Sequence, residues 1–136
     1  MPERSLVVVP TYNERDNISR MIDAVLGKDA SLDILVVDDG SPDGTGSLVA
    51  AIASANDRVH LLRRSGKLGL GTAYIAGFKW ALERDYAYVF QMDADFSHDP
   101  AYIPELFNAV KSSDVVVGSR YRDGRANVVN WPVSRL

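Results

Sequence analysis

Short apolar runs rich in β-branched residues alternate along this chain with segments in which apolar residues recur at helical spacing. The runs lie at residues 6–9, 34–37, 59–62, 86–92 and 115–117. Apolar runs of this length are typical of strands buried on both faces of a parallel sheet. Their alternation with helices predicts an α/β fold, in which a mostly parallel sheet carries helices on both faces and right-handed crossovers join the strands.

The segments between the runs carry the apolar stripe of helices that pack on a sheet. Apolar residues follow the i, i+3, i+4, i+7 pattern over residues 18–26 and again over residues 103–110. A third helix is expected over residues 71–83. Its inward-facing side chains are predicted to be Ile75, Phe78 and Leu82.

Polar residues and glycine mark the ends of these helices. Starts are predicted at Asn13, at Ser41 and at Asp99, because each can cap a helix N-terminus and the last two precede a proline. Gly27 is predicted to end the first helix, since glycine is the residue most often found just after a helical C-terminus.

The composition is that of one globular domain, and it limits the partners of the chain. Of the 136 residues, 46% are hydrophobic and 24% are charged, which allows one buried core. The net charge of −3 argues against broad affinity for nucleic acid, so no nucleic-acid partner is expected. The absence of cysteine excludes disulfides and thiolate metal ligands. His60, inside a predicted strand, is expected to be structural, whereas His98 is open between a metal ligand, a general base and a structural role.

Acidic residues follow two of the predicted strands directly. Asp38 and Asp39 come after one run, and Asp93 and Asp95 come after another. The carboxyl ends of parallel strands meet at one edge of a sheet, where open α/β folds bind their ligands. Asp93 and Asp95 suit Mg²⁺ or Mn²⁺ bound together with a diphosphate, because such sites often use only one or two carboxylates. The alternative for Asp93 and Asp95 is a solvated turn. The alternative for Asp39 is a role in forming a turn, and this is the main interpretation of Asp43.

Two further segments have the composition of phosphate contacts. The glycine-rich segment 66–71, which includes Lys67 and Gly69, would allow close backbone approach to an anion, although it matches neither common nucleotide motif. A flexible connection is the alternative. Arg120 follows the last predicted strand, where a guanidinium group could clamp phosphate oxygens, and a solvated basic turn is the alternative there.

Five short segments stand in a fixed order along the chain. They read Val-Val-Pro-Thr-Tyr-Asn-Glu at 8–14, Val-Val-Asp-Asp-Gly-Ser-Pro-Asp-Gly at 36–44, Gly-Lys-Leu-Gly-Leu-Gly at 66–71, Met-Asp-Ala-Asp at 92–95 and Gly-Ser-Arg-Tyr at 118–121. In this order they resemble family 2 glycosyltransferases with a GT-A fold, most closely the polyprenol- and dolichol-phosphate mannose synthases. The resemblance implies the Rossmann-like nucleotide-binding half of a GT-A fold. It also implies transfer of mannose from GDP-mannose to a polyprenyl or dolichyl phosphate, with inversion at the anomeric carbon and with Mg²⁺ or Mn²⁺ on the diphosphate.

The resemblance also implies roles for individual residues. The nucleotide-sugar contacts would come from Pro10, Tyr12, Glu14, Asp39, Lys67, Gly69 and Asp93. Asp93 would lie near the ribose or the metal, and Asp95 would be the direct metal ligand. Arg120 and Arg135 would bind phosphate of the donor or of the lipid. Ser97 departs from the family pattern, because some members carry glutamine there and a ligand from serine would be shorter.

The resemblance further implies how the chain is organised. Residues 1–136 are expected to form a single nucleotide-sugar-binding domain, with its core at 1–121 and the start of an acceptor-site region at 122–136. Family members continue beyond this length, so a membrane-anchoring segment or subunit is expected outside the chain, and the whole protein at the cytoplasmic face of a membrane. Two alternatives stay open: a related transferase that uses UDP-glucose or another nucleotide sugar, and a truncated binding module without full transfer activity.

Overall fold

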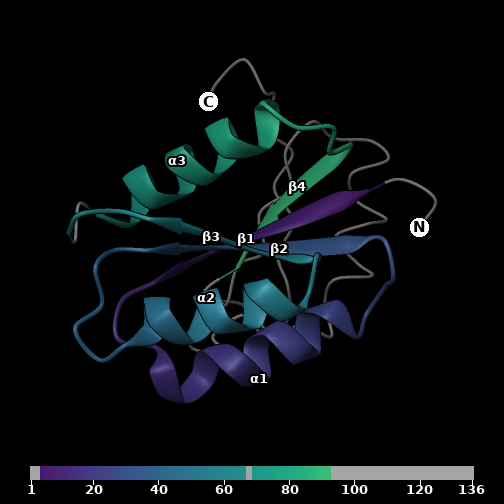
Figure 1. Ribbon diagram of the computed structural model, residues 1–136. Helices are drawn as coiled ribbons and strands as arrows, with labels where there is room; N and C mark the ends of the chain where they lie inside the picture. Colours follow the sequence, from purple (N-terminus) through teal and green to yellow (C-terminus); the bar gives the residue numbers. More distant parts are fainter. Residues whose placement is uncertain (1–3, 67–68, 93–136) are drawn as a thin grey trace, which may run out of the picture.

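The computed structural model describes residues 4–66 and 69–92. Within this part of the chain, no helix is both long and apolar enough to cross a membrane. Strands and helices alternate, as Figure 1 shows. The elements are β1 (Ser5–Thr11), α1 (Arg15–Leu26), β2 (Leu32–Asp38), α2 (Thr45–Ala55), β3 (Val59–Arg63), α3 (Leu70–Leu82) and β4 (Tyr88–Gln91). The predicted helix at 103–110 and the predicted strand at 115–117 lie outside the described residues.

The four described strands form one parallel sheet in the order β3-β2-β1-β4. At the centre of β1, Val7 is paired with Ile34 on one side and with Phe90 on the other. The chain moves outward from β1 to β3 and then returns to place β4 on the opposite side of β1. The strand order therefore reverses between β1 and β4, and ligands of open α/β sheets bind at the carboxyl end of such a point.

Helices cover both faces of the sheet, which confirms the predicted α/β fold. Figure 1 shows α1 and α2 on one face and α3 on the other. Alternate residues of β1 serve the two layers: Val7 and Val9 pack in the core under α1 and α2, whereas Leu6 and Val8 pack in the core under α3. All four side chains are fully buried. A strand with two buried faces needs apolar residues on both faces along its middle, which is why β1 and β2 appear in the sequence as continuous apolar runs.

The inward face of α3 differs from the prediction. Phe78 packs against the core as expected, but Ile75 and Leu82 are 49% and 81% exposed. The buried face of the helix is instead made by small residues spaced four apart: Ala73, Gly77 and Ala81. The prediction was wrong because it weighted large apolar side chains, whereas a helix that lies very close to a sheet has room only for small ones.

Two helix starts also differ from the prediction, while the predicted end at Gly27 is confirmed. The helix α1 begins at Arg15 and α2 begins at Thr45, so neither Asn13 nor Ser41 is the residue at the helix boundary. These two polar residues connect the two loops instead, since the backbone N–H of Asn13 donates to Ser41 Oγ over 2.9 Å. The predicted start at Asp99 lies beyond the described part of the chain.

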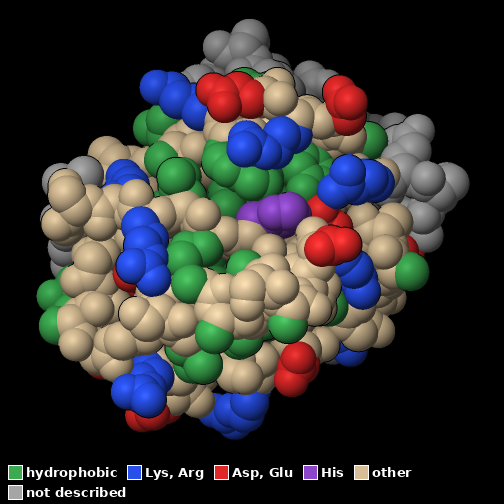
Figure 2. Space-filling view, in the orientation of Figure 1, with side chains coloured by type: hydrophobic (Ala, Val, Ile, Leu, Met, Phe, Trp, Pro, Cys, Tyr) green, Lys and Arg blue, Asp and Glu red, His purple; other side chains and the backbone are tan. Residues whose placement is uncertain are grey.

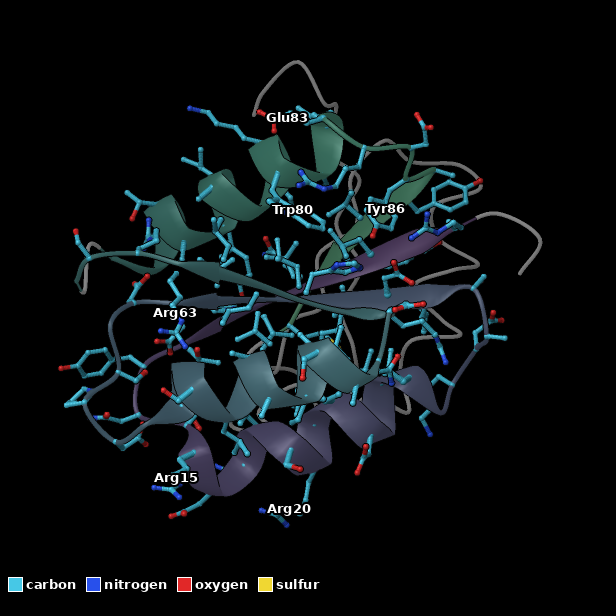
Figure 3. All side chains as sticks on the ribbon, viewed as in Figure 1. Arg15, Arg20, Arg63, Trp80, Glu83 and Tyr86 are labelled. Carbon is cyan, nitrogen blue, oxygen red and sulfur yellow. The ribbon has the colours of Figure 1, made fainter. Side chains whose placement is uncertain are left out.

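A polar cluster closes the amino edge of the sheet under α3. The buried carboxylate of Asp33 accepts a hydrogen bond from the Tyr86 hydroxyl over 2.7 Å, lies 3.0 Å from His60 Nε2, and pairs with Arg4. Burial, together with the hydrogen bond to Asp33, raises the pKa of the Tyr86 hydroxyl, so this group remains a donor. Trp80 stacks on Tyr86, and Figure 3 shows both on the side of the sheet that α3 covers. These contacts confirm the structural role expected for His60.

Charged side chains lie mainly outside these layers. On the face drawn in Figure 2, Lys and Arg side chains are interspersed with Asp and Glu. Mixed charge of this kind is ordinary for the surface of a small domain.

Replacement of Gly77 by alanine is expected to lower the free energy of unfolding by about 1–2 kcal/mol. The new Cβ would lie 2.4 Å from Val8 Cγ1. Val8 is buried and β-branched, so its side chain cannot turn away easily. The overpacking costs more than alanine gains over glycine in helix propensity. Urea denaturation followed by circular dichroism would measure the change.

Gly71→Ala is the matched control, because it lies in the same helix and nothing lies within 4 Å of its added Cβ. It is expected to be neutral or stabilising. Equal destabilisation by the two substitutions would contradict the proposed contact between Gly77 and Val8.

Candidate functional site

The loops that follow β1, β2 and β3 meet at the carboxyl edge of the sheet. Thr11 is paired with Asp38, and Asp38 is paired in turn with Arg63, whose side chain Figure 3 places at this edge. The backbone N–H of Asp39 donates to the carbonyl of Thr11 over 3.1 Å, and that of Arg64 donates to the carbonyl of Asp38 over 2.8 Å. The sheet ladder thus continues one residue into the loops and holds their polar side chains close together.

Asp38 holds this edge together from inside. Its carboxylate is almost fully buried. Oδ1 accepts hydrogen bonds from the hydroxyls of Thr11 (2.8 Å) and Ser41 (2.6 Å), and Oδ2 accepts one from the backbone N–H of Ser41 (3.1 Å). A Cβ at Gly46 would lie 3.0 Å from Oδ2, so only glycine leaves that side of the carboxylate clear. Asp38 therefore links the end of β1 to the loop that follows β2 through these buried hydrogen bonds.

Asp39 is paired with a cation. Arg64 binds its carboxylate with two hydrogen bonds, from Nε to Oδ1 over 2.6 Å and from Nη2 to Oδ2 over 2.8 Å. The exposed fractions of the two side chains are 12% for Arg64 and 7% for Asp39. The hydrogen bond to Asp39 raises the pKa of the Arg64 guanidinium, which stays charged. Fork-to-fork pairing of this kind fixes the plane of the carboxylate.

Arg64 was missed by the sequence analysis, although a signal for it exists. It comes directly after β3, just as Asp39 comes directly after β2. Residues that follow parallel strands are expected to gather at one edge of the sheet, and this expectation applies to Arg64 after β3 as it does to the acids and to Arg120.

Asp43 joins the starts of the two helices on one face. Its Oδ1 accepts hydrogen bonds from the backbone N–H of Thr45 over 3.0 Å and from the Thr45 hydroxyl, and its Oδ2 accepts one from the backbone N–H of Arg15 over 3.2 Å. These bonds, led by the one from the Thr45 hydroxyl, lower the pKa of the Asp43 carboxyl. The interpretation of Asp43 as a turn and capping residue is confirmed.

The structure brings several of the predicted contact residues to this edge. Tyr12 follows β1 and is 38% exposed. Glu14 lies at the N-terminal boundary of α1, where its carboxylate accepts a hydrogen bond from the Asn17 side chain over 3.2 Å. Gly69 precedes α3 with φ of 103°, a conformation that suits glycine. Pro10 lies inside β1 and is buried.

The predicted metal ligands lie outside the described residues, as do Lys67, Arg120 and Arg135. In the part of the chain that is described, no group of three or more His, Cys, Asp or Glu side chains is arranged to hold a metal. Met92 is the last residue that the structure describes, and its backbone N–H donates to the carbonyl of Val8 over 3.0 Å. Asp93 is the next residue in sequence.

Comparison with known proteins settles the family. A family model described as glycosyl transferase family 2 matches residues 6–136. This chain belongs to glycosyl transferase family 2. It is 49% identical over 136 residues to a polyprenol monophosphomannose synthase of Mycolicibacterium smegmatis, covering 98% of this chain and 51% of that protein. It is 47% identical over 132 residues to an undecaprenyl-phosphate mannosyltransferase of Micrococcus luteus, covering 97% and 54%. The chain thus spans about half the length of these curated relatives.

Solved structures show the same fold. The mannosyltransferase PcManGT of Pyrobaculum calidifontis, in complex with GDP-Man and Mn²⁺, matches with a TM-score of 0.60 and 29% identity over 70% of this chain and 28% of that one. Glucosyl-3-phosphoglycerate synthase of Mycobacterium tuberculosis, in complex with Mn²⁺, UDP and glucosyl-3-phosphoglycerate, matches with a TM-score of 0.63 and 25% identity over 90% and 46%. These neighbours confirm the expected GT-A fold of this family 2 domain.

The stabilising effect of Asp43 is expected to depend on pH. Because its pKa is lowered in the folded state, its hydrogen bonds stabilise the fold above the ordinary aspartate pKa, and this contribution is lost as the pH falls through the lowered value. Asp43→Ala should therefore destabilise the protein at pH 7 and make less difference near pH 2. Urea denaturation at the two pH values would measure this difference.

Asp57→Ala is a control that removes an exposed acid from the loop before β3. It should change the free energy of unfolding by no more than about 0.5 kcal/mol at pH 7. An Asp43→Ala effect that is the same at both pH values would argue that the carboxylate does not stabilise the two helix starts through its charge.

Proposed function

We propose that this chain is the nucleotide-sugar-binding part of a metal-dependent, inverting glycosyltransferase that transfers mannose from GDP-mannose to a polyprenyl or dolichyl phosphate. The observation that carries the proposal is the 49% identity, over nearly the whole chain, to a relative named as a polyprenol monophosphomannose synthase. The described carboxyl edge supports it, because Arg64 joins the carboxylate of Asp39 to the start of α3 at the edge where open α/β sheets bind their ligands. PcManGT, a structural neighbour, was solved with GDP-Man and Mn²⁺.

Asp39 and Tyr12 form the described part of the proposed nucleoside pocket, together with Pro10 and Glu14. An ionised carboxylate accepts hydrogen bonds only, so Asp39 suits a base that presents N–H groups, such as guanine. Tyr12 is exposed enough for its ring to contact a ligand. Gly69 and Lys67 would lie along the diphosphate, where the start of α3 favours negative charge.

Asp93 and Asp95 would hold the divalent cation. The fit rests on chemistry and position: both residues carry oxygen ligands of the kind that Mg²⁺ and Mn²⁺ prefer, and they follow the strand that pairs with β1 at the reversal of strand order. When bound, such an ion stabilises negative charge on the departing diphosphate.

The transfer itself needs little from the protein beyond positioning. An oxygen of the lipid phosphate attacks the anomeric carbon from the face opposite the diphosphate, a new carbon–oxygen bond forms, and GDP leaves with the bonding electron pair. The attacking phosphate is already an anion at neutral pH, so no general base has to remove a proton. Arg120 and Arg135 would bind phosphate oxygens and hold donor and acceptor in line.

Two other functions are supported by particular observations. A neighbour of similar TM-score, glucosyl-3-phosphoglycerate synthase, was solved with UDP, which favours a UDP-sugar donor as the second candidate. The chain spans about half of its curated relatives, which favours a binding module whose acceptor region and membrane anchor lie elsewhere, in the same protein or in a partner subunit. We place the whole protein at the cytoplasmic face of a membrane, because its proposed acceptor is a lipid phosphate.

Binding of GDP-mannose is expected to require the divalent metal and Asp95. Calorimetric titration of GDP-mannose and UDP-glucose, each in Mn²⁺ and in EDTA, would measure this. GDP-mannose in Mn²⁺ should bind most tightly, and Asp95→Ala should reduce that affinity to the value found in EDTA, because a metal ligand facing the diphosphate is lost. Asp57→Ala serves as the charge-matched control. Equal affinity of wild type and Asp95→Ala in both media would rule out Asp95 as a ligand.

Mannose transfer by the 136-residue chain is expected to be far slower than transfer by the polyprenol monophosphomannose synthase of Mycolicibacterium smegmatis, of which the chain covers 51%. Alignment of two reactants lowers a barrier by roughly 7–11 kcal/mol in well-oriented model systems, and that alignment needs both binding sites. The assay would follow radiolabelled mannose from GDP-mannose to polyprenyl phosphate in matched detergent and Mg²⁺. Comparable turnover would mean that the acceptor site is complete by Leu136, and would make Arg120 and Arg135 the main candidates for binding the lipid phosphate.

A further inference from the structure

The guanidinium group of Arg64 lies between the loop after β2 and the start of α3. Besides its two hydrogen bonds to Asp39, it donates from Nη1 to Thr72 Oγ1 over 3.0 Å and from Nη2 to the carbonyl of Gly69 over 3.3 Å. Its own backbone N–H is held by the carbonyl of Asp38. Four hydrogen bonds therefore use most of the five N–H groups of the guanidinium and leave it one orientation.

The contacts to α3 explain why Arg64 is rigid enough to orient another side chain. Thr72 Oγ1 donates to the carbonyl of Gly69 over 2.8 Å while it accepts from Arg64, so the first turn of the helix is closed around the guanidinium. The helix in turn is seated on the sheet through Gly77 and Val8. A long arginine side chain, which is usually costly to immobilise, is thereby held from two sides.

We propose that Arg64 is a specificity-determining positioning residue, which orients the Asp39 carboxylate for recognition of the nucleobase. This inference rests on the proposed function of Asp39 in the nucleoside pocket. An ionised carboxylate offers about four acceptor directions. Arg64 takes two of them and fixes the plane of the group, so the remaining two have a set direction toward N–H donors of a base.

Loss of Arg64 would change the chemistry of Asp39 as well as its orientation. The Asp39 side chain is 7% exposed, and a buried carboxylate without a cation is costly. It would respond by binding a proton or by turning toward water. A protonated acid presents a donor where the base needs an acceptor, so discrimination among bases would fall even where binding of the phosphates survives.

The test compares pairs of nucleotides that differ in base donors. GDP and IDP differ by the amino group of guanine, and UDP and CDP differ at N3, which carries a hydrogen in uracil alone. Dissociation constants in Mn²⁺ would be measured by calorimetry for wild type, Arg64→Ala and Arg64→Lys. The wild type is expected to bind GDP more tightly than IDP. Arg64→Ala should weaken GDP binding about tenfold. The ratio of the dissociation constants for GDP and IDP, called here the GDP/IDP ratio, should then be close to one. Arg64→Lys keeps the positive charge but cannot donate two parallel hydrogen bonds to the carboxylate, so it should restore little of the preference for GDP over IDP.

Arg20→Ala is the matched control, since it removes an exposed arginine from α1, outside the carboxyl edge. Its GDP/IDP ratio should equal that of the wild type. An unchanged ratio in Arg64→Ala or, if that variant does not fold by circular dichroism, in Arg64→Lys would overturn the inference, and so would tighter GDP binding by either variant.

The same four nucleotides separate this inference from the proposed function. A wild type that prefers UDP to CDP, and not GDP to IDP, would contradict GDP-mannose as donor, while loss of the UDP/CDP ratio in the Arg64 variants would still support the role of Arg64. Failure of the wild type to bind any of the four would overturn both.

Discussion

The burial of β1 on both faces is the constraint on which the rest of this structure depends. Its residues pack under α1 and α2 on one side and under α3 on the other, and strands pair along both of its edges. Between its polar end residues, Ser5 and Thr11, this strand carries only apolar side chains, because a buried polar group without a partner is costly. Chemistry is therefore confined to the residues after the strand ends, which is where Tyr12, Glu14 and their neighbours lie.

The two ends of the sheet use buried carboxylates in different ways. At the amino edge, Asp33 collects His60, Tyr86 and Arg4 into a closed cluster. At the carboxyl edge, Asp39 is paired with one guanidinium among the described residues, and we propose that the other acceptor directions of its carboxylate serve a ligand. The proposed function needs acids of the second kind, since a nucleotide must be able to reach them. The first kind stabilises the opposite edge of the sheet.

The sequence predicted the layers of this fold well, and its details less well. Short continuous apolar runs bounded by turn residues are typical of strands buried on both faces, as in β1 and β2. Asp43 was recognisable because aspartate beside glycine forms turns. The contacts of Asn13 and Ser41 could not be foreseen, since they join loops whose spacing depends on the register of β1 and β2. Arg64 was overlooked for a similar reason: its partners lie on β2 and α3, and only the assembled sheet brings them together.

The small residues beneath α3 have a consequence for the entropy of folding. Large side chains lose rotamer freedom when a helix docks on a sheet, whereas alanine and glycine have none to lose. Ala73, Gly77 and Ala81 therefore let α3 pack on β1 without loss of side-chain rotamer freedom at these three positions. The close approach of the helix backbone to Val8 depends on them, and alternative rotamers cannot vary it there. The positions of Gly69 and Thr72 relative to the sheet, at the beginning of the same helix, are therefore well defined too.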